Sequence, residues 1–135
     1  MSAVPTYAGI PNVGTANLGT AETEVKPPQH AVLLTTAGAN GTKIEEVILQ
    51  AVAASLTPTS TASLVYVYIY DGTNYWLRDV LTVTAVTASA TTAPFRLSKT
   101  YTNLWLKSGE ALYASMSAAQ GTGTSLDVTA QGLDA

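Results

Sequence analysis

The feature that most limits the fold of this chain is the run Leu-Val-Tyr-Val-Tyr-Ile-Tyr at residues 64–70. β-branched and aromatic residues favour extended backbone, and successive side chains of a strand point to opposite faces. One face would therefore carry Val65, Val67 and Ile69, and the other Tyr66, Tyr68 and Tyr70. The following Asp-Gly-Thr-Asn, at 71–74, is typical of a tight turn into a second strand. The run predicts a β-hairpin, and hence a protein built on sheets.

The same kind of short strand recurs between turn residues from residue 30 to the end of the chain. Besides 64–70, we expect strands over 31–36, 75–86, 94–100, 104–107, 111–117 and 125–130. With 43–56 these make about eight. A sheet must cover its apolar face, and a second sheet is the usual cover where helices are absent. The predicted class is all-β, a β-sandwich or jelly roll.

Segment 43–56 permits two interpretations. Its apolar residues Ile44, Val47, Ile48 and Ala51 fall on one helical stripe, so periodicity alone favours a helix. In a strand, Val47, Leu49 and Ala51 would share a face instead. We expect a strand, on the strength of the family resemblance described below.

Residues 1–29 differ from the rest because proline and glycine interrupt them repeatedly and no period of 2 or 3.6 is sustained. We expect an extended N-terminal arm over 1–29 and a β-sandwich domain over 30–135. The arm is either a disordered end or a segment that docks on a partner. Docking would use the apolar residues spaced along it, namely Val4, Tyr7, Ile10, Val13 and Leu18.

The tyrosines of 64–70 also leave two interpretations open. A central strand can bury both of its faces, and the tyrosines would then belong to the core. Tyrosine is also enriched at protein interfaces, because its ring packs while its hydroxyl bonds. On that second interpretation Tyr66, Tyr68 and Tyr70 form a subunit interface.

The charge of the chain argues against several classes of partner. Only 11% of residues are charged and the net charge is −3, while nucleic-acid binding needs clustered Lys and Arg. We therefore expect no nucleic-acid partner. No apolar run is long enough to cross a bilayer and no signal peptide is recognisable, so we also expect no membrane partner. The absence of cysteine fits synthesis in a reducing cytoplasm.

No catalytic or metal-binding constellation is recognisable in the sequence. His30 is the single histidine, which is too few for the usual zinc ligand sets, and no nucleophile-elbow motif accompanies it. Asp71 and Asp79 could lie near each other, as two acids of any hairpin can. We expect a non-enzymatic protein without catalytic residues, metal or cofactor. Trp76 and Trp105 would be a sugar platform if exposed, but a buried tryptophan is the commoner case.

The order of turns and strands resembles a family of small virion proteins of tailed bacteriophages that decorate or cement capsids. The resemblance covers about residues 31–135. It rests on these segments: Gly38 to Gly41, the Ile-rich stretch from Ile44, Tyr70 to Asn74, Trp76 to Val80, Ser108 to Ser115, and Asp127 to Gly132.

The resemblance implies a β-sandwich or jelly-roll subunit that forms a homotrimer on the outer surface of the capsid. Its partners would be the major capsid protein and other copies of itself. It would be made in the host cytoplasm and then reside in the virion. Similar β-modules serve in tails and fibres, so a tail or fibre module and a carbohydrate-binding module stay open as alternatives.

Overall fold

The computed structural model describes residues 9–135, so the expected arm contacts Val4 and Tyr7 lie outside the described residues. The described part contains eight strands and no helix. The strands are β1 (Ile10–Leu18), β2 (Val32–Thr36), β3 (Thr42–Ala53), β4 (Ser63–Tyr70), β5 (Tyr75–Val83), β6 (Arg96–Leu106), β7 (Ala111–Met116) and β8 (Thr124–Asp134). The expected all-β class with about eight strands is confirmed.

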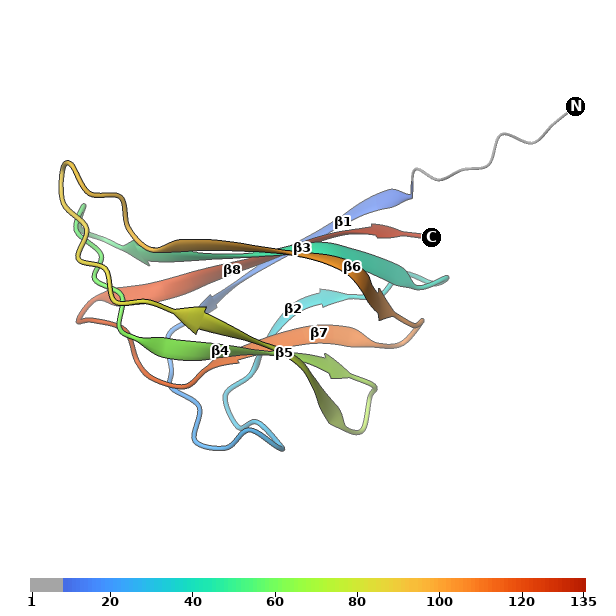
Figure 1. Cartoon of the computed structure of the whole chain (residues 1–135). Helices are drawn as coiled ribbons and strands as arrows, with labels where there is room; N and C mark the ends of the chain where they lie inside the picture. Colours follow the sequence, from blue (N-terminus) through green and yellow to red (C-terminus); the bar gives the residue numbers. More distant parts are fainter. Residues whose placement is uncertain (1–8) are drawn as a thin grey trace, which may run out of the picture.

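The strands form two four-stranded antiparallel sheets that pack face to face (Figure 1). Their orders are β1-β8-β3-β6 and β2-β7-β4-β5. The pairs 1–8, 2–7, 3–6 and 4–5 are those of one long hairpin folded over on itself, which is the jelly-roll arrangement. The sequence predicted a β-sandwich or a jelly roll, and the observed strand order is that of a jelly roll.

The core lies between the two sheets and consists almost entirely of aliphatic side chains. Val65 and Val67 face inward as the alternation predicted, and neither is exposed at all. Other fully buried members are Ile44, Val47, Leu49, Leu112, Met116, Leu126 and Val128. These side chains interdigitate between the two sheets and form the close-packed interior of the domain.

Of segment 43–56, residues 43–53 belong to the strand β3, and a β-bulge explains the helix-like pattern. In the pairing of β3 with β8, Ile44 lies opposite Gly132 and Glu46 opposite Gln131, which leaves Glu45 as an extra residue. The bulge lets Ile44 and Val47 both face the core although they are three residues apart. A spacing of three is what a helix would show, so the bulge makes a strand look helical in sequence.

The expected boundary at residue 29 is corrected by β1. Ile10–Leu18 pairs with β8 along its whole length, from Ile10 opposite Asp134 to Leu18 opposite Leu126. Only 1% of the Leu18 side chain is exposed. The strand was not expected because its inward positions include Asn12 and Gly14 instead of an apolar series. This part of the expected arm is thus an edge strand of the domain.

β6 is also one strand where the sequence suggested two, over 94–100 and 104–107. Its pairing with β3 skips from Leu104 to Thr100, so residues 101–103 form an irregularity inside a continuous strand. The unexpected β1 and the merged β6 offset each other in the strand count.

The two sheets approach closely along one side, where β1 meets β2. A Cβ atom added to Gly14 would lie 1.8 Å from the carbonyl oxygen of Leu34. Beside it, the Asn12 side chain donates to the Thr36 carbonyl oxygen over 3.0 Å and accepts a bond from the Thr35 hydroxyl. The sandwich is therefore closed along the β1–β2 side by direct backbone packing.

Candidate interaction surfaces

The outer face of the β2-β7-β4-β5 sheet carries an aromatic and uncharged surface. Every strand position in register with Tyr66, Tyr68 or Tyr70 is uncharged. These positions hold Leu33, Thr36, Tyr75, Leu77, Val80, Ala111, Tyr113 and Ser115. We call this set, with the three tyrosines of β4, the tyrosine face. An uncharged sheet face of this kind suits contact with another protein surface.

The three tyrosines of β4 are not equally accessible. Tyr66 and Tyr70 are half-buried, whereas only 1% of Tyr68 is exposed. The Tyr68 hydroxyl lies 3.2 Å from the Ser115 hydroxyl, and burial raises the pKa of Tyr68. The expected role of Tyr68 at a subunit interface is therefore corrected: it belongs to the interior of its own subunit, while Tyr66 and Tyr70 stay accessible.

Sequence reasoning missed most of the remaining tyrosine face. The Tyr75 ring lies 4.4 Å from the Tyr70 ring and 5.3 Å from the Tyr113 ring, measured between centroids. The Tyr70–Tyr75 pair could have been found, because the four-residue turn at 71–74 sets these residues opposite each other. Tyr113 needed the β4–β7 pairing, which joins segments far apart in the chain.

Three aliphatic side chains widen the tyrosine face and are exposed in the subunit. Leu33 is 44% exposed, Leu77 45% and Val80 40%. Burying such side chains stabilises a contact by about 25 cal/mol for each Å² removed from water. These three are consequently the positions at which a partner gains most from covering the face.

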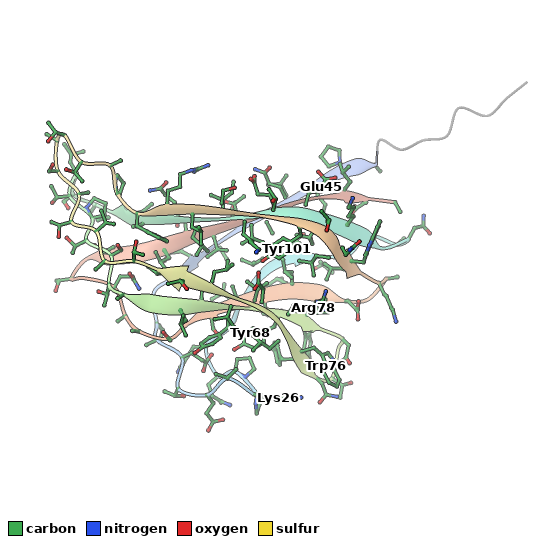
Figure 2. The ribbon with its side chains drawn as sticks, in the orientation of Figure 1. Lys26, Glu45, Tyr68, Trp76, Arg78 and Tyr101 are labelled. Atoms are coloured by element: carbon green, nitrogen blue, oxygen red, sulfur yellow. The ribbon has the colours of Figure 1, made fainter. Side chains whose placement is uncertain are left out.

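The loop 19–31 runs along the outer side of this sheet (Figures 1 and 2). The Glu22 backbone N–H donates to the Met116 carbonyl oxygen over 2.7 Å. Farther along, the Lys26 ammonium lies 4.6 Å from the centre of the Trp76 ring (Figure 2). Val25 of this loop is 38% exposed. The loop therefore forms one rim of the tyrosine face.

The Glu22 carboxylate holds this loop in shape. It accepts backbone N–H bonds from Thr23 (3.0 Å), Glu24 (3.3 Å), Gln29 (2.7 Å) and His30 (2.7 Å). Burial alone would raise the pKa of Glu22, but the four N–H donors outweigh it and the net pKa lies below the ordinary value. His30, the single histidine, contributes its backbone here and its side chain is exposed.

Three of the arm residues expected to contact a partner lie in the described part of the chain, and they differ in exposure. Ile10 is 71% exposed and Val13 61% exposed, so both are available to a partner. Leu18 is a core residue and is corrected accordingly. Ile10 and Val13 lie on β1, an edge strand of the other sheet, and not on the tyrosine face.

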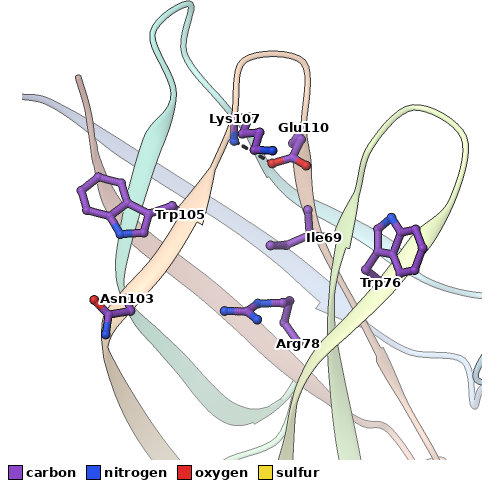
Figure 3. A pocket seen from close by; sticks show the side chains of 7 residues that line it. All are labelled: Ile69, Trp76, Arg78, Asn103, Trp105, Lys107 and Glu110. Atoms are coloured by element: carbon purple, nitrogen blue, oxygen red, sulfur yellow. Dashed lines mark hydrogen bonds between the residues drawn. The ribbon is translucent and has the colours of Figure 1, made fainter.

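A groove opens on the side of the sandwich opposite the closed β1–β2 side (Figure 3). Its volume is about 450 Å³ and its lining includes Ile69, Arg78, Asn103 and Lys107. A second hollow of about 270 Å³ shares Arg78 and Asn103 with it and follows β6 from Lys99 to Leu104. The two hollows form one groove between the edge strands β5 and β6, which we call the β5–β6 groove.

Trp76 and Trp105 stand at the walls of the β5–β6 groove, and their rings point away from each other (Figure 3). They are 48% and 56% exposed, so the expectation of buried tryptophans is wrong. The Trp76 ring also donates to Asp71 over 2.9 Å, and the Lys43 ammonium lies 5.6 Å from the Trp105 ring centre. Each indole thus already carries a polar partner.

The acidic residues that could have served catalysis have structural partners. Asp71 accepts N–H bonds from Asn74 (2.7 Å) and Thr73 (2.8 Å) and closes the β4–β5 turn, which lowers its pKa. Asp79 accepts the Tyr101 hydroxyl over 2.7 Å; burial and this bond raise the pKa of Tyr101 far above its usual range. Within residues 9–135, no group of three His, Cys, Asp or Glu side chains could hold a metal ion.

Comparison with known proteins adds no relative. No family model, no curated protein and no solved structure matches this chain. Within the part of the chain that the structure describes, no helix is long and apolar enough to span a membrane. The fold and its surfaces define the class, an eight-stranded jelly-roll sandwich with an uncharged tyrosine face.

Proposed function

We propose that this chain is a non-enzymatic capsid decoration or cement protein of a tailed bacteriophage. In this proposal the protein binds the outer capsid surface as a homotrimer and stabilises the contacts between neighbouring major capsid proteins. It is made in the host cytoplasm and resides in the virion. It works by burying surface across joints of the shell, where repetition multiplies a modest affinity.

The observation that carries the proposal is the tyrosine face. Its exposed Leu33, Leu77 and Val80 surround half-buried tyrosines without a charged strand position. Aromatic enrichment with depletion of charge distinguishes the core of protein interfaces from ordinary surface. We assign the accessible part of this face, which includes Tyr66 and Tyr70 and excludes the buried Tyr68, to the contact between subunits.

The contact with the capsid is assigned to the N-terminal side of the molecule. Ile10 and Val13 are exposed on β1, and the segment that carries Val4 and Tyr7 precedes it. An edge strand can pair with an extended segment of a partner, which gives a mode of attachment. A truncation that tests this must stop at residue 8, because β1 pairs with β8 and removing it would expose a core edge.

The test is a binding experiment on capsids of the phage that encodes this chain, stripped of the protein. We expect the purified protein to restore full occupancy on the outer shell in an electron-microscopy map and to raise the temperature at which capsids rupture. A variant lacking residues 1–8 should fold normally and bind weakly. Location on the tail, or no binding to capsids, would contradict the proposal; normal binding of the truncated variant would remove only the N-terminal role.

A carbohydrate-binding module is the alternative with some structural support. Trp76 and Trp105 are half-exposed beside Arg78 and Asn103, a combination that sugar sites use. However, the indole rings point away from the groove and carry lysines, so neither offers a free stacking surface inside it. A glycan array decides: specific hits lost in Trp105→Ala would favour this alternative.

A further inference from the structure

Two β-bulges face each other across the β5–β6 groove and shape it. On β5, Val67 pairs with Asp79 and Tyr68 with Leu77, so Arg78 between them is the extra residue. On β6, residues 101–103 are skipped in the pairing with β3. Bulges re-aim side chains and concentrate at sites of function and at strand edges. Here they direct Arg78 into the space between the strands (Figure 3).

The groove is cationic in character. Arg78, Lys99 and Lys107 line it, which is half of the six basic residues of the chain. The carboxylates of Glu110, which lines the groove, and of Asp79, which lies beside it, already accept hydrogen bonds. Glu110 accepts the Lys107 backbone N–H over 2.6 Å, and Asp79 accepts both the Tyr101 hydroxyl and the Val80 N–H. These bonds leave the carboxylates charged, but three cations and one carboxylate, Glu110, line the groove, so its lining has a net positive charge.

The groove also runs beside backbone that, among residues 9–135, has no strand partner on one side. β5 and β6 each end their sheet, so each has one free edge. The two hollows together follow β6 from Lys99 to Lys107. Along this stretch Ile69 and Leu104 supply apolar contact. An edge strand with pockets beside it is the form in which proteins bind extended peptides by adding a strand.

We propose that the β5–β6 groove binds an extended acidic segment of a partner protein, which pairs with the free edge of β6 and places carboxylates against Arg78, Lys99 and Lys107. The guanidinium of Arg78 matches a carboxylate in geometry and can form two parallel bonds with it. This site adjoins the tyrosine face along β5 but uses other side chains than that face and β1, so it does not depend on the proposed decoration role.

Charges and bulges at an edge also prevent unwanted pairing between strands. Peptide binding and protection of the edge differ in the peptides that they admit. A cationic edge repels a basic strand and gains nothing from a neutral one, whereas it attracts an acidic strand. Protection alone would leave the groove empty with every peptide, and this difference makes the proposal testable.

The test uses fluorescence polarisation with the full chain and a labelled peptide of about ten alternating Glu and Val residues. We expect saturable binding that weakens with salt, and no binding of the matching Lys and Val peptide. Arg78→Glu should weaken binding about tenfold or more. The matched control is Arg96→Glu, which makes the same charge change on β6 outside the groove lining.

The N–H groups of alternate residues in a bound strand point toward β6, and the others point away from it. Two peptides, each with the backbone nitrogens of one of these sets methylated, test the strand pairing. Only the set that faces β6 should abolish binding, and amide shifts in NMR spectra should concentrate between Lys99 and Lys107. Three outcomes would overturn the proposal. These are no binding of the acidic peptide, equal loss in Arg78→Glu and Arg96→Glu, and indifference to both methylation patterns, which would reduce the groove to a general anion site.

Discussion

Single side chains decide the shape of the longest loop in this protein. Glu22 is a buried polar residue. Its carboxylate accepts hydrogen bonds from four backbone N–H groups of the loop 19–31. A carboxylate that accepts several N–H bonds is held in its charged form, because the donors satisfy that charge. The loop thus depends on an ionised side chain for its conformation.

Replacing Glu22 with Gln should lower the free energy of unfolding by about 2 kcal/mol at pH 7, since bonds from backbone donors to a charged group weaken. The folded-state pKa of Glu22 lies below its ordinary value of 4.5. Its contribution is therefore complete above that value and is lost as the pH falls through the folded-state pKa. Urea unfolding of both proteins at several pH values checks this.

The matched control is Glu24→Gln, which removes the same charge from an exposed side chain of the same loop. Among residues 9–135, the Glu24 carboxylate accepts one hydrogen bond, from the Gln29 side-chain amide over 3.5 Å. We expect a change within about 0.5 kcal/mol for this variant. Equal effects of the two substitutions would show that net charge and not the loop is responsible. A Glu22→Gln difference that does not shrink in acid would show that the ionised carboxylate is not its source.

At the scale of elements, the contact between β1 and β2 is the most demanding sterically. Gly14 has no side chain, and this allows its backbone to lie against the Leu34 carbonyl group. Glycine is used where two backbones must approach closely. Gly19, one residue beyond β1, has no such neighbour: a Cβ atom there would lie 3.8 Å from the nearest atom, in Asn17.

Gly14→Ala should therefore destabilise the domain by about 4 kcal/mol or more, because the new methyl group must push β1 away from β2. Gly19→Ala should be nearly neutral, and thermal unfolding of the two variants measures the difference. Faster hydrogen exchange in β1 and β8 would localise the damage in Gly14→Ala. A small loss of stability in Gly14→Ala would mean that β1 can shift without cost, contrary to the packing described here.

The two strand assignments that the sequence left uncertain or missed have physical explanations at this scale. β3 resembles a helix in its apolar spacing because the bulge at Glu45 changes the phase of the strand between Ile44 and Val47. β1 resembles a linker because the close approach to β2 requires a small residue where a typical strand has an apolar one. Bulges and close approaches depend on the partner strand, which local patterns do not reveal.

The regular hairpins were predictable because their determinants are local. The alternation in 64–70 and the turn at 71–74 predicted β4, β5 and the inward positions Val65 and Val67. The candidate surfaces were only partly predictable. Tyr66 and Tyr70 were identified from β4 alone, but Tyr113, Leu33 and the β5–β6 groove arise from pairings between distant segments.

At the scale of the whole molecule, the two outer faces differ in character. The strand positions of the tyrosine face are uncharged, whereas the outer face of the β1-β8-β3-β6 sheet mixes polar and charged side chains such as Asn17, Asp127 and Arg96 with the exposed Val13 and Trp105. Asn17 donates to Asp127 over 2.9 Å on that second face. An uncharged face with exposed aliphatic side chains is typical of a protein contact, and we assign it to the contact between subunits.

The double substitution Leu77→Lys with Val80→Lys should abolish the proposed trimer and leave the fold intact, because both side chains are exposed in the subunit. Light scattering should report three times the 14.0 kDa subunit for the unmodified protein and a single subunit for the variant. Thr15→Lys, an exposed strand position on the opposite sheet, is the control and should keep the trimer. A double variant that stays trimeric would exclude the tyrosine face as the subunit contact.

The pairing of Ile10 with Asp134 brings the first described strand and the last residues of the chain to the same end of the sandwich (Figure 1). A peptide fused after Ala135 would consequently emerge beside the start of β1, and not at the tyrosine face. The same neighbourhood suits circular permutation of residues 9–135, because a short linker can join Ala135 to the start of β1 and new termini can be opened in an exposed turn such as 71–74. The pairing of β1 with β8 thus determines where a peptide fused to the C-terminus is displayed on this molecule.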